Sequence, residues 1–255
     1  MPVADFSLEG KVAIVTGGSR GIGRSIAIGL AEHGADVVVA ARKPESMAEA
    51  VAALEKTGRR GLAVATNVRR IDELRNLVEE TKHELGRIDI VVNNAGSNPV
   101  FGPVHEIDEG AWDMIMNTNV KSIHFLSNFA REAMLEHGDG GSIINVSSVG
   151  GFLASDVIGG YSVSKAAVVM LTQVQAKNWG ADKIRVNCIA PGLIKTEFAK
   201  ALWDNPKIRA ASESESALRR IGEPDEMAGA VVYLASPAAS FVTGQTLILD
   251  GGRRL

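Results

Sequence analysis

Near its N-terminus the chain reads Lys11-Val-Ala-Ile-Val-Thr16-Gly17-Gly-Ser-Arg20-Gly21-Ile22-Gly23. Residues 11–16 form a short apolar run rich in β-branched side chains, which predicts a strand buried on both faces. A glycine-rich turn with Gly17, Gly21 and Gly23 follows at once, and apolar residues at helical spacing then continue to His33. A strand, a glycine turn and a helix in this order favour phosphate binding. The glycines let the backbone approach the ligand, and the helix N-terminus offers free N–H groups and a positive dipole end. The alternative is a tight turn without a ligand.

The rest of the chain alternates strand and helix patterns in the same way. Further strands are predicted at residues 36–41, 61–66, 88–92, 141–146, 183–189 and 246–249, and helices at 45–57, 71–85, 109–137, 161–179 and 224–235. This alternation indicates βαβ units with right-handed crossovers, so that helices cover both faces of a parallel sheet. We expect a single α/β domain over residues 1–255, a doubly wound Rossmann fold with a seven-stranded parallel sheet. Residues 198–218 are less regular and are expected to form a lid over the substrate.

Composition excludes several classes of protein. The 255 residues are 45% hydrophobic with a formal net charge of −3, so nothing favours nucleic-acid binding. No apolar run approaches the roughly 20 residues of a membrane span, and no signal peptide is apparent. The one cysteine, Cys188, cannot form an internal disulfide, and its apolar neighbours indicate a buried structural thiol. We therefore expect a cytoplasmic protein without a membrane partner or a metal site.

A candidate acid–base pair lies in the stretch Tyr161-Ser-Val-Ser-Lys165. If the stretch is helical, the two side chains lie on one face, one turn apart. A free tyrosine has a pKa of about 10, and bringing that pKa near 7 takes about 4 kcal/mol. The ammonium of Lys165 would supply part of this by favouring the phenolate, and a bound cationic cofactor ring would supply more. The pair predicts a general acid–base. The alternative is an exposed helix face with one aromatic residue.

The end of the second predicted strand bears on the choice of cofactor. An acidic residue there binds the ribose hydroxyls of NAD, whereas an arginine accommodates the 2′-phosphate of NADP. This chain has Ala41, Arg42 and Lys43, and Arg20 in the glycine turn is a further cation. The pattern favours NADP(H), with NAD(H) possible. The alternative is that Arg42 and Lys43 begin a solvated helix.

Polar residues also follow the later strands, at the edge where ligands of open α/β sheets bind. Asn93-Asn94-Ala95-Gly96 follows the fourth strand, where it can approach a cofactor and tie loops together; a simple turn is the alternative. Ser147-Ser148 ends the fifth strand. Asn119 stands inside a predicted helix, so it indicates a local distortion with a function, a satisfied buried amide, or both. In the loop 150–160 we expect Phe152, Leu153 and Ile158 to line a substrate pocket.

With these motifs the chain resembles the short-chain dehydrogenase/reductase family over nearly its whole length. The motifs, in family order, are Thr16-Gly17-x-x-x-Gly21-x-Gly23, Asn93-Asn94-Ala95-Gly96, Asn119, Ser148, Tyr161-x-x-x-Lys165 and Pro191-Gly192. The resemblance implies an NAD(P)-dependent carbonyl/alcohol oxidoreductase. By that resemblance Tyr161 is the general acid–base, and Ser148 orients and polarises the carbonyl oxygen. Lys165 lowers the pKa of Tyr161 and holds the nicotinamide ribose, while Asn119 supports a water-linked proton path.

The expected cofactor site combines these motifs with the basic residues. Its members are Gly17, Ser19, Arg20, Gly21, Ile22, Gly23, Arg42, Asn67, Val68, Asn94, Ala95, Gly96, Tyr161, Lys165, Pro191, Gly192, Ile194 and Thr196. In one place the chain departs from the family, which usually carries Asp-Val after the third strand where this chain has Asn67-Val68. An amide can still bond an adenine ring, so we expect no loss of binding.

A closer likeness is to the peroxisomal-type carbonyl and retinol reductases of the family, which use NADP. It rests on Asn98-Pro-Val-Phe-Gly102, Ala190-Pro-Gly-Leu-Ile-Lys-Thr196, Leu202-Trp203 and Arg220-Ile-Gly-Glu-Pro224. Their C-terminal peroxisomal address has at best a weak variant here, Arg253-Arg254-Leu255. Family members are commonly homotetramers, which the resemblance implies here too.

Three functions remain open from the sequence. The first is NADP(H)-dependent interconversion of a small-molecule ketone or aldehyde and its alcohol by hydride transfer. The second is reduction of 3-oxoacyl thioesters in lipid metabolism. The third is a non-catalytic dinucleotide-binding sensor or scaffold, which the presence of Ser148, Tyr161 and Lys165 disfavours. The sequence does not identify the substrate.

Overall fold

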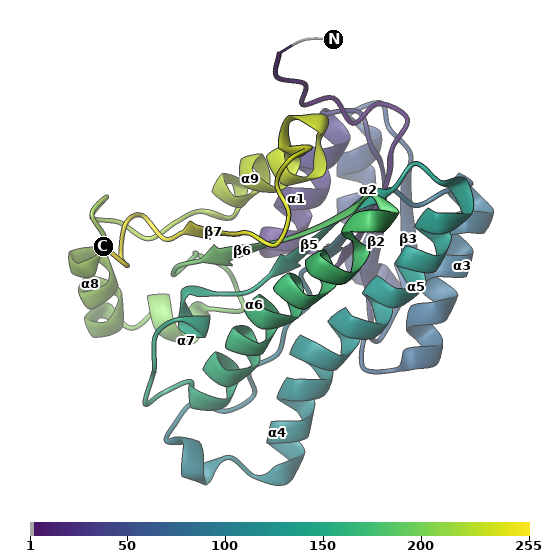
Figure 1. Ribbon diagram of the computed structural model, residues 1–255. Coiled ribbons are helices and arrows are strands. Elements are labelled where there is room, and N and C mark those ends of the chain that lie inside the picture. Colours follow the sequence, from purple (N-terminus) through teal and green to yellow (C-terminus); the bar gives the residue numbers. More distant parts are fainter. Residues whose placement is uncertain (1–2) are drawn as a thin grey trace.

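The computed structural model describes residues 3–255, which contain a seven-stranded sheet (Figure 1). Its strands are β1 (Val12–Thr16), β2 (Asp36–Ala41), β3 (Gly61–Ala65), β4 (Ile90–Asn93), β5 (Gly141–Val146), β6 (Ile184–Pro191) and β7 (Thr246–Leu249). Their order in the sheet is β3-β2-β1-β4-β5-β6-β7, and every neighbouring pair is parallel. The predicted doubly wound Rossmann fold is confirmed.

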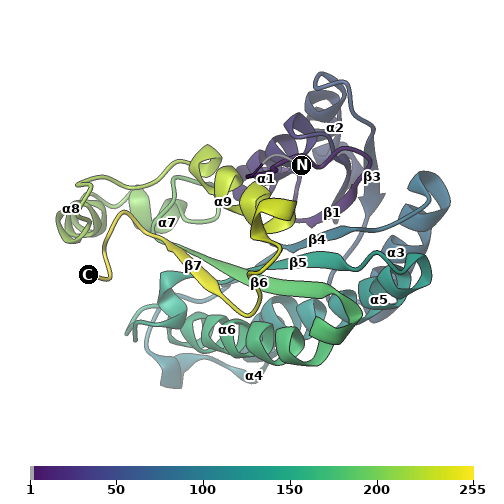
Figure 2. The ribbon, with the colours of Figure 1, turned by 45° about the horizontal axis from the view of Figure 1, so that its top comes forward.

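Helices cover both faces of the sheet, as Figure 2 shows. The helices on one face are α1 (Gly21–Glu32), α2 (Ala48–Glu55) and α9 (Ala228–Ala235), and those on the other are α3 (Ile71–Leu85), α5 (Ser122–His137) and α6 (Gly159–Trp179). Successive residues of a strand pack against opposite helix layers. In β2, Val37 and Val39 pack on the α1 side and Val38 packs on the α3 side. Burial on both faces is the reason that these strands read as continuous apolar runs.

The strand order reverses between β1 and β4, which lie side by side in the middle of the sheet. From β1 the chain crosses toward β2 and β3, and from β4 it crosses the other way toward β5, β6 and β7. Connections that leave in opposite directions open a crevice at the carboxyl ends of these two strands. The glycine turn after β1 and the loops after β4 and β5 therefore begin at one edge of the sheet.

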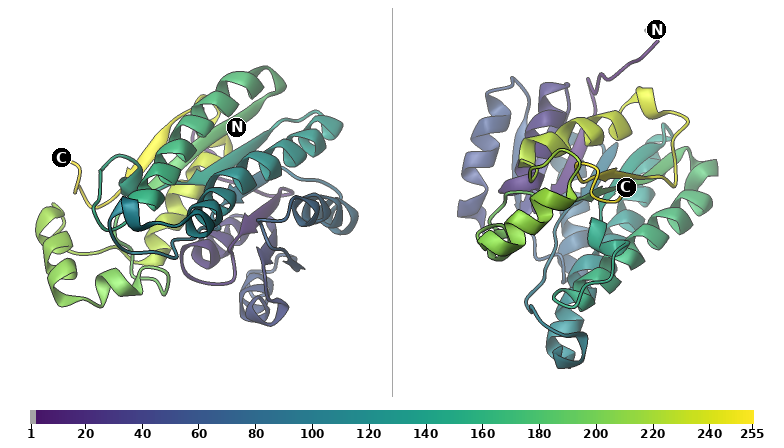
Figure 3. Two further views of the ribbon diagram at one scale, coloured as in Figure 1. Left: turned by 90° about the horizontal axis from the view of Figure 1, so that it is seen from below. Right: turned by 90° about the vertical axis from the view of Figure 1, so that its left-hand side faces the viewer.

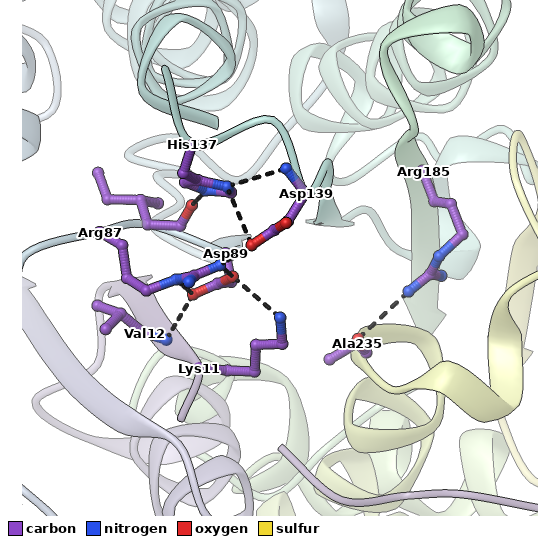
Figure 4. Close-up of polar contacts among 9 residues, drawn as sticks. Lys11, Val12, Arg87, Asp89, His137, Asp139, Arg185 and Ala235 are labelled. Carbon is purple, nitrogen blue, oxygen red and sulfur yellow. Dashed lines mark hydrogen bonds and ion pairs between the residues drawn. The ribbon is translucent and has the colours of Figure 1, made fainter. Parts of the chain in front are cut away.

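Ion pairs occupy the opposite edge of the sheet (Figure 4). The buried carboxylate of Asp89 accepts hydrogen bonds from the backbone N–H of Val12 at 3.0 Å and from Nζ of Lys11 at 3.2 Å. Arg87 donates to Asp89 at 2.6 and 2.8 Å and to Asp139 at 2.9 Å. These contacts join the start of β1, the approach to β4 and the end of α5. The polar groups at this edge are partners for one another.

Two segments differ from the sequence-based expectation. The helix expected over residues 109–137 is interrupted, because α4 (Glu109–Met116) passes into a π-helical turn at Asn117–Lys121 before α5 begins. Residues 198–218, expected to be irregular, contain the helices α7 (Lys200–Trp203) and α8 (Pro206–Glu215). The side chain of Asn205 caps α8, an Asn-Pro start that favours a helix. Both helices lie at the margin of the sheet beside the C-terminus (Figure 3).

Candidate active site

The glycine turn between β1 and α1 requires glycine for two separate reasons. Gly17 and Gly21 have φ angles of +65° and +54°, a conformation that other residues rarely adopt. A Cβ added to Gly23 would lie 2.4 Å from the backbone oxygen of Gly17 and 2.4 Å from Nδ2 of Asn94. The turn is therefore packed directly against the loop after β4, with no room for a side chain at its base.

Asn94 joins the glycine turn to the end of β4. Its Nδ2 donates a hydrogen bond to the carbonyl oxygen of Thr16 at 2.8 Å. In return, Oγ1 of Thr16 accepts the backbone N–H groups of Asn94 and Ala95 at 3.0 and 3.1 Å. These bonds hold two loops together across the point where the strand order reverses, so this segment is more than a simple turn.

The N-terminus of α1 fits a phosphate group. In the described part of the chain, no side chain caps this helix end and no acidic residue stands in its first turn. Its first residues, Gly21 to Gly23, line the large cleft at the carboxyl edge of the sheet. Free backbone donors combined with a positive dipole end are suited to the pyrophosphate of a dinucleotide.

Among the cations that line the cleft, three lie in the glycine turn or directly after β2, and we call this region the basic end. They are Arg20, Arg42 and Lys43. Within residues 3–255 no carboxylate forms an ion pair with any of them, whereas the nearby Arg24 contacts Glu49 at 3.5 Å. The strand β2 ends at Ala41. An unpaired cluster of cations in the wall of a cleft is suited to a second phosphate group.

Asn67 and Val68 follow β3 and also line the cleft. Oδ1 of Asn67 accepts the backbone N–H of Arg69 at 3.2 Å, and the backbone N–H of Asn67 donates to Glu73 at 2.6 Å. Because its oxygen is already engaged, the Asn67 side chain can offer a ligand the donors of its amide group. An aspartate at this position would offer an acceptor in their place.

Lys165 is buried in α6, and its ammonium is fixed by the sheet. Nζ donates to the carbonyl oxygen of Val146, the last residue of β5, at 2.8 Å. Oγ of Ser147 donates to the carbonyl oxygen of Lys165 at 2.7 Å, a contact that sequence reasoning had not singled out. Burial lowers the pKa of Lys165 to about 8, because a charge removed from water is disfavoured.

Tyr161 lies one helical turn before Lys165, and its hydroxyl meets Ser148. Burial raises the pKa of Tyr161 to about 12, and the hydrogen bond with the side chain of Ser148 offsets only part of this rise. The expected lowering of this pKa by Lys165 is not met in the protein alone. The Lys165 ammonium bonds Val146 and stands 5.4 Å from the centroid of the Tyr161 ring. Ser148 also accepts the N–H of Gly150 at 3.0 Å, which fixes its hydroxyl.

Asn119 lies in the π-helical turn and is fully buried. Its Nδ2 donates to the carbonyl oxygen of Ser97 at 3.0 Å and to Oγ of Ser164 at 2.9 Å, while its Oδ1 accepts the N–H of Ser97 at 2.8 Å. The buried amide is satisfied and the helix is distorted around it, as expected, while a function of the distortion stays a prediction. A Cβ added to Gly96 would lie 3.7 Å from Oδ1 of Asn119 and 3.8 Å from Nζ of Lys165. Both groups therefore border the space beside Gly96.

A single cleft of about 1210 Å³ unites the expected site residues. Every residue expected to contact the cofactor lines it, and so does Ser148; Asn119 stands behind the wall. On the β5 side the cleft is mainly apolar, and we call this region the apolar end. Its lining includes Phe101, Met114, Leu153, Val157, Ile158, Phe198, Leu202 and Ile208. Phe152, expected among them, is not part of the lining. Phe198, Leu202 and Ile208 lie in the segment 198–218 that was expected to form the lid, whereas Phe101 and Met114 were not expected in the pocket.

Known proteins are similar to this chain in sequence and in fold. A family model described as enoyl-(acyl carrier protein) reductase matches residues 17–254. The chain is 41% identical over 245 residues to dehydrogenase/reductase SDR family member 4 of Oryctolagus cuniculus, which covers 96% of this chain and 94% of that protein. The chain belongs to the short-chain dehydrogenase/reductase family. The similarity also agrees with the suspected likeness to peroxisomal-type carbonyl and retinol reductases.

Solved structures of this family share the whole fold. A gluconate 5-dehydrogenase from Burkholderia cenocepacia, in complex with NADP and tartrate, is 34% identical with a TM-score of 0.93, covering 98% of each chain. A carveol dehydrogenase from Mycobacterium avium, in complex with NAD, is 28% identical with a TM-score of 0.92, covering 99% of each chain. This short-chain dehydrogenase/reductase is thus an oxidoreductase that depends on a nicotinamide dinucleotide. In residues 3–255 no helix is long and apolar enough to cross a membrane.

Proposed function

We propose that this short-chain dehydrogenase/reductase interconverts a ketone or aldehyde and its alcohol, with NADP(H) as the preferred cofactor. One observation carries the proposal: a hydroxyl pair and a buried ammonium, from Ser148, Tyr161 and Lys165, lie in the same cleft as a glycine turn suited to a dinucleotide. The cofactor supplies or accepts the hydride, and the chain supplies position and a proton.

In the direction of reduction, Tyr161 is the proton donor. Its pKa of about 12 means that the hydroxyl holds its proton at neutral pH. An alkoxide is a far stronger base than a phenolate, so the proton moves to the substrate oxygen as charge develops there. Ser148 donates a hydrogen bond to the same oxygen and stabilises the developing charge. In the direction of oxidation, Tyr161 must lose its proton first, and a positive charge on the bound cofactor ring and on Lys165 lowers the cost of doing so.

The preference for NADP(H) rests on the basic end of the cleft. Arg42 and Lys43 follow β2, and Arg20 lies in the glycine turn. A 2′-phosphate on the adenosine ribose would be met there by cations that no carboxylate of the described residues neutralises. The relatives do not decide the matter, since one named above binds NADP and another binds NAD.

The substrate is proposed to be a small organic carbonyl compound that occupies the apolar end. Its lining offers large aliphatic and aromatic surfaces, among them Phe198, whose ring centroid lies 6.2 Å from that of Tyr161. Side chains of this kind favour apolar groups beside the reacting carbonyl. The helices α7 and α8 contribute Leu202 and Ile208 and are proposed to act as the lid.

We also propose a homotetramer, supported by two separate exposed surfaces. On α6, Val163, Met170 and Val174 lie on one face with exposed fractions of 48, 59 and 47%. The strand β7 ends the sheet and exposes Ile248. Two different surfaces that each pair with their own copy generate a tetramer of D2 symmetry. Native mass spectrometry should give a tetramer for the wild type and a dimer for Met170→Glu. A monomeric wild type would refute this assembly.

The test of the proposed reaction is a substrate panel. Purified protein is mixed with NADPH or NADH and with ketones, aldehydes or a 3-oxoacyl thioester, and loss of the reduced nicotinamide absorbance is followed. We expect turnover of free carbonyl compounds, with NADPH preferred by at least about tenfold in kcat/KM, since a lost charged contact costs about this much. Activity confined to the acyl thioester would support the rival assignment in lipid metabolism.

A further inference from the structure

The C-terminal residues 250–255, which the proposed reaction leaves without a role, fold back onto the lid. Figures 1 and 2 show the C-terminus beside α8. The carbonyl oxygen of Gly251 accepts the backbone N–H of Leu218 and the hydroxyl of Ser216, each at 3.0 Å. The C-terminal tail is therefore anchored to the segment just after α8. This anchor places the side chains of Arg253 and Arg254 between α8 and the loop that follows β5.

Arg253 binds the last residue of α8. Its Nε and Nη2 lie 2.7 and 2.6 Å from Oε2 of Glu215. Arg253 also lines the cleft that contains Tyr161. The guanidinium thus lies at the wall of the reaction cleft, and its charge is paired with Glu215 of the lid helix. Because of this pair, Arg253 connects the tail to α8 and is not free to bind an anionic ligand.

Arg254 reaches the opposite side, toward the loop that follows Ser148. Its guanidinium carbon lies 4.4 Å from the centroid of the Phe152 ring, a cation–π contact. The backbone N–H of Arg254 is held by Asp250 at 3.0 Å. Phe152 lies outside the cleft lining, while its neighbour Leu153 is part of it.

We propose that Arg253 and Arg254 form a strap that determines substrate specificity, by tying α8 to the loop 149–158 and so fixing the width of the apolar end. Arg253 holds one wall through Glu215, and Arg254 holds the other through Phe152. Each contact alone is weak, because such pairs are partly exposed. Together they fix the distance between the two walls, because both walls are loop or lid elements at the margin of the sheet. The inference rests on the proposed reaction only for its consequence on substrates.

The first test is hydrogen–deuterium exchange on the ligand-free full chain. Arg253→Ala should raise exchange in residues 206–215, Arg254→Ala should raise it in residues 149–158, and the double variant should raise it in both by about fivefold. Arg209→Ala is the matched control, since it removes an ion pair with Glu213 at 2.8 Å that lies wholly within α8 and connects it to no other element. That variant should leave residues 149–158 unchanged. Unchanged exchange in both segments of the double variant would overturn the strap.

The second test separates specificity from a general loss of structure. In the double variant, KM for a bulky ketone from the panel should rise by about fivefold, while KM for NADPH and kcat change less than about twofold. The exchange of charges in Glu215→Arg with Arg253→Glu should restore the low exchange of α8, which neither single change does. Should the wild type reduce no carbonyl compound, the proposed reaction fails, but the exchange experiment still decides the strap.

Discussion

The ammonium of Lys165 is bonded to the backbone carbonyl oxygen of Val146 at 2.8 Å and stands 5.4 Å from the ring centroid of Tyr161. The position of the lysine is therefore set by the end of β5 as well as by its place one turn after Tyr161. In the protein alone, burial dominates both groups, so that the pKa of Tyr161 is raised and the pKa of Lys165 is lowered. The proposed acid–base pair is a protonated phenol beside a cation that is costly to keep charged, and ligands bound in the cleft would add to its electrostatics.

The buried lysine gives stability a defined pH dependence. The pKa of Lys165 is about 8 in the folded protein and 10.5 as its ordinary value, so between these values the unfolded chain binds more protons. The contribution of Lys165 to the free energy of unfolding therefore rises with pH from 8 to 10.5, and below pH 8 its buried charge carries the full cost. In urea denaturation, the unfolding free energy of Lys165→Met should exceed that of the wild type by the largest amount at pH 7.5. This difference should become smaller toward pH 10.

The control for this experiment is Lys177→Met, which replaces an exposed lysine of the same helix. The difference in unfolding free energy between this variant and the wild type should not vary between pH 7.5 and 10. A constant difference for Lys165→Met over the same range would contradict the burial of its charge.

Gly23→Ala should damage the glycine turn. The new Cβ would meet the backbone oxygen of Gly17 at 2.4 Å, and backbone cannot yield as a flexible side chain does. We expect the melting temperature to fall, as overpacking costs about 1–3 kcal/mol of stability. NADPH affinity, measured by fluorescence titration, should also drop, because the backbone that is suited to the phosphates is displaced. Gly229→Ala is the control: it lies in α9 with open space around its Cβ position, so helix propensity should leave it neutral or stabilised. Equal behaviour of the two variants would refute the role of this contact.

Arg42→Ala tests the basic end of the cleft. Loss of one charged partner of a phosphate should weaken NADPH binding by about 10- to 100-fold and leave NADH binding within about threefold. Isothermal titration with both cofactors measures this directly, without turnover. Arg70→Ala is a suitable control, because Arg70 is exposed, pairs with Asp72 and lies outside the cleft. A parallel loss of NADPH and NADH affinity would show that Arg42 does not distinguish them.

The order of elements could be predicted because β1, β2, β4, β5 and β6 are largely buried apolar runs, and glycine or polar residues follow the strands directly. Strands 36–41 and 141–146 and helix 71–85 have the predicted bounds. The helix ends where predicted because Gly86 adopts the left-handed conformation, with φ of +84°. The break in helix 109–137 was signalled by Asn119, but the π-helical turn depends on the bonds of its amide to Ser97 and Ser164. Contacts between distant segments of this kind have no linear pattern.

The residues expected at the cofactor share one cleft as predicted, because they sit at strand ends that the topology brings together, and their binding of the cofactor stays a prediction. The apolar end could be predicted only as two segments, the loop 150–160 and the lid 198–218, and the strap could not be predicted. Arg254 and Phe152 are 102 positions apart in the chain (254 − 152), and only the fold places the tail of β7 against the loop after β5. The pKa of Tyr161 was also beyond the sequence, because it is set by burial rather than by the identity of its neighbours.

The most direct test of the account is the rate of hydride transfer in a single turnover of Tyr161→Phe with NADPH and a ketone that the wild type reduces. Removing the hydroxyl while keeping the ring against Phe198 should slow the reaction by about 10²–10⁴-fold, the usual contribution of a general acid, with NADPH affinity within about threefold of the wild type. A rate equal to that of the wild type would mean that the proton comes from elsewhere and would contradict the central claim.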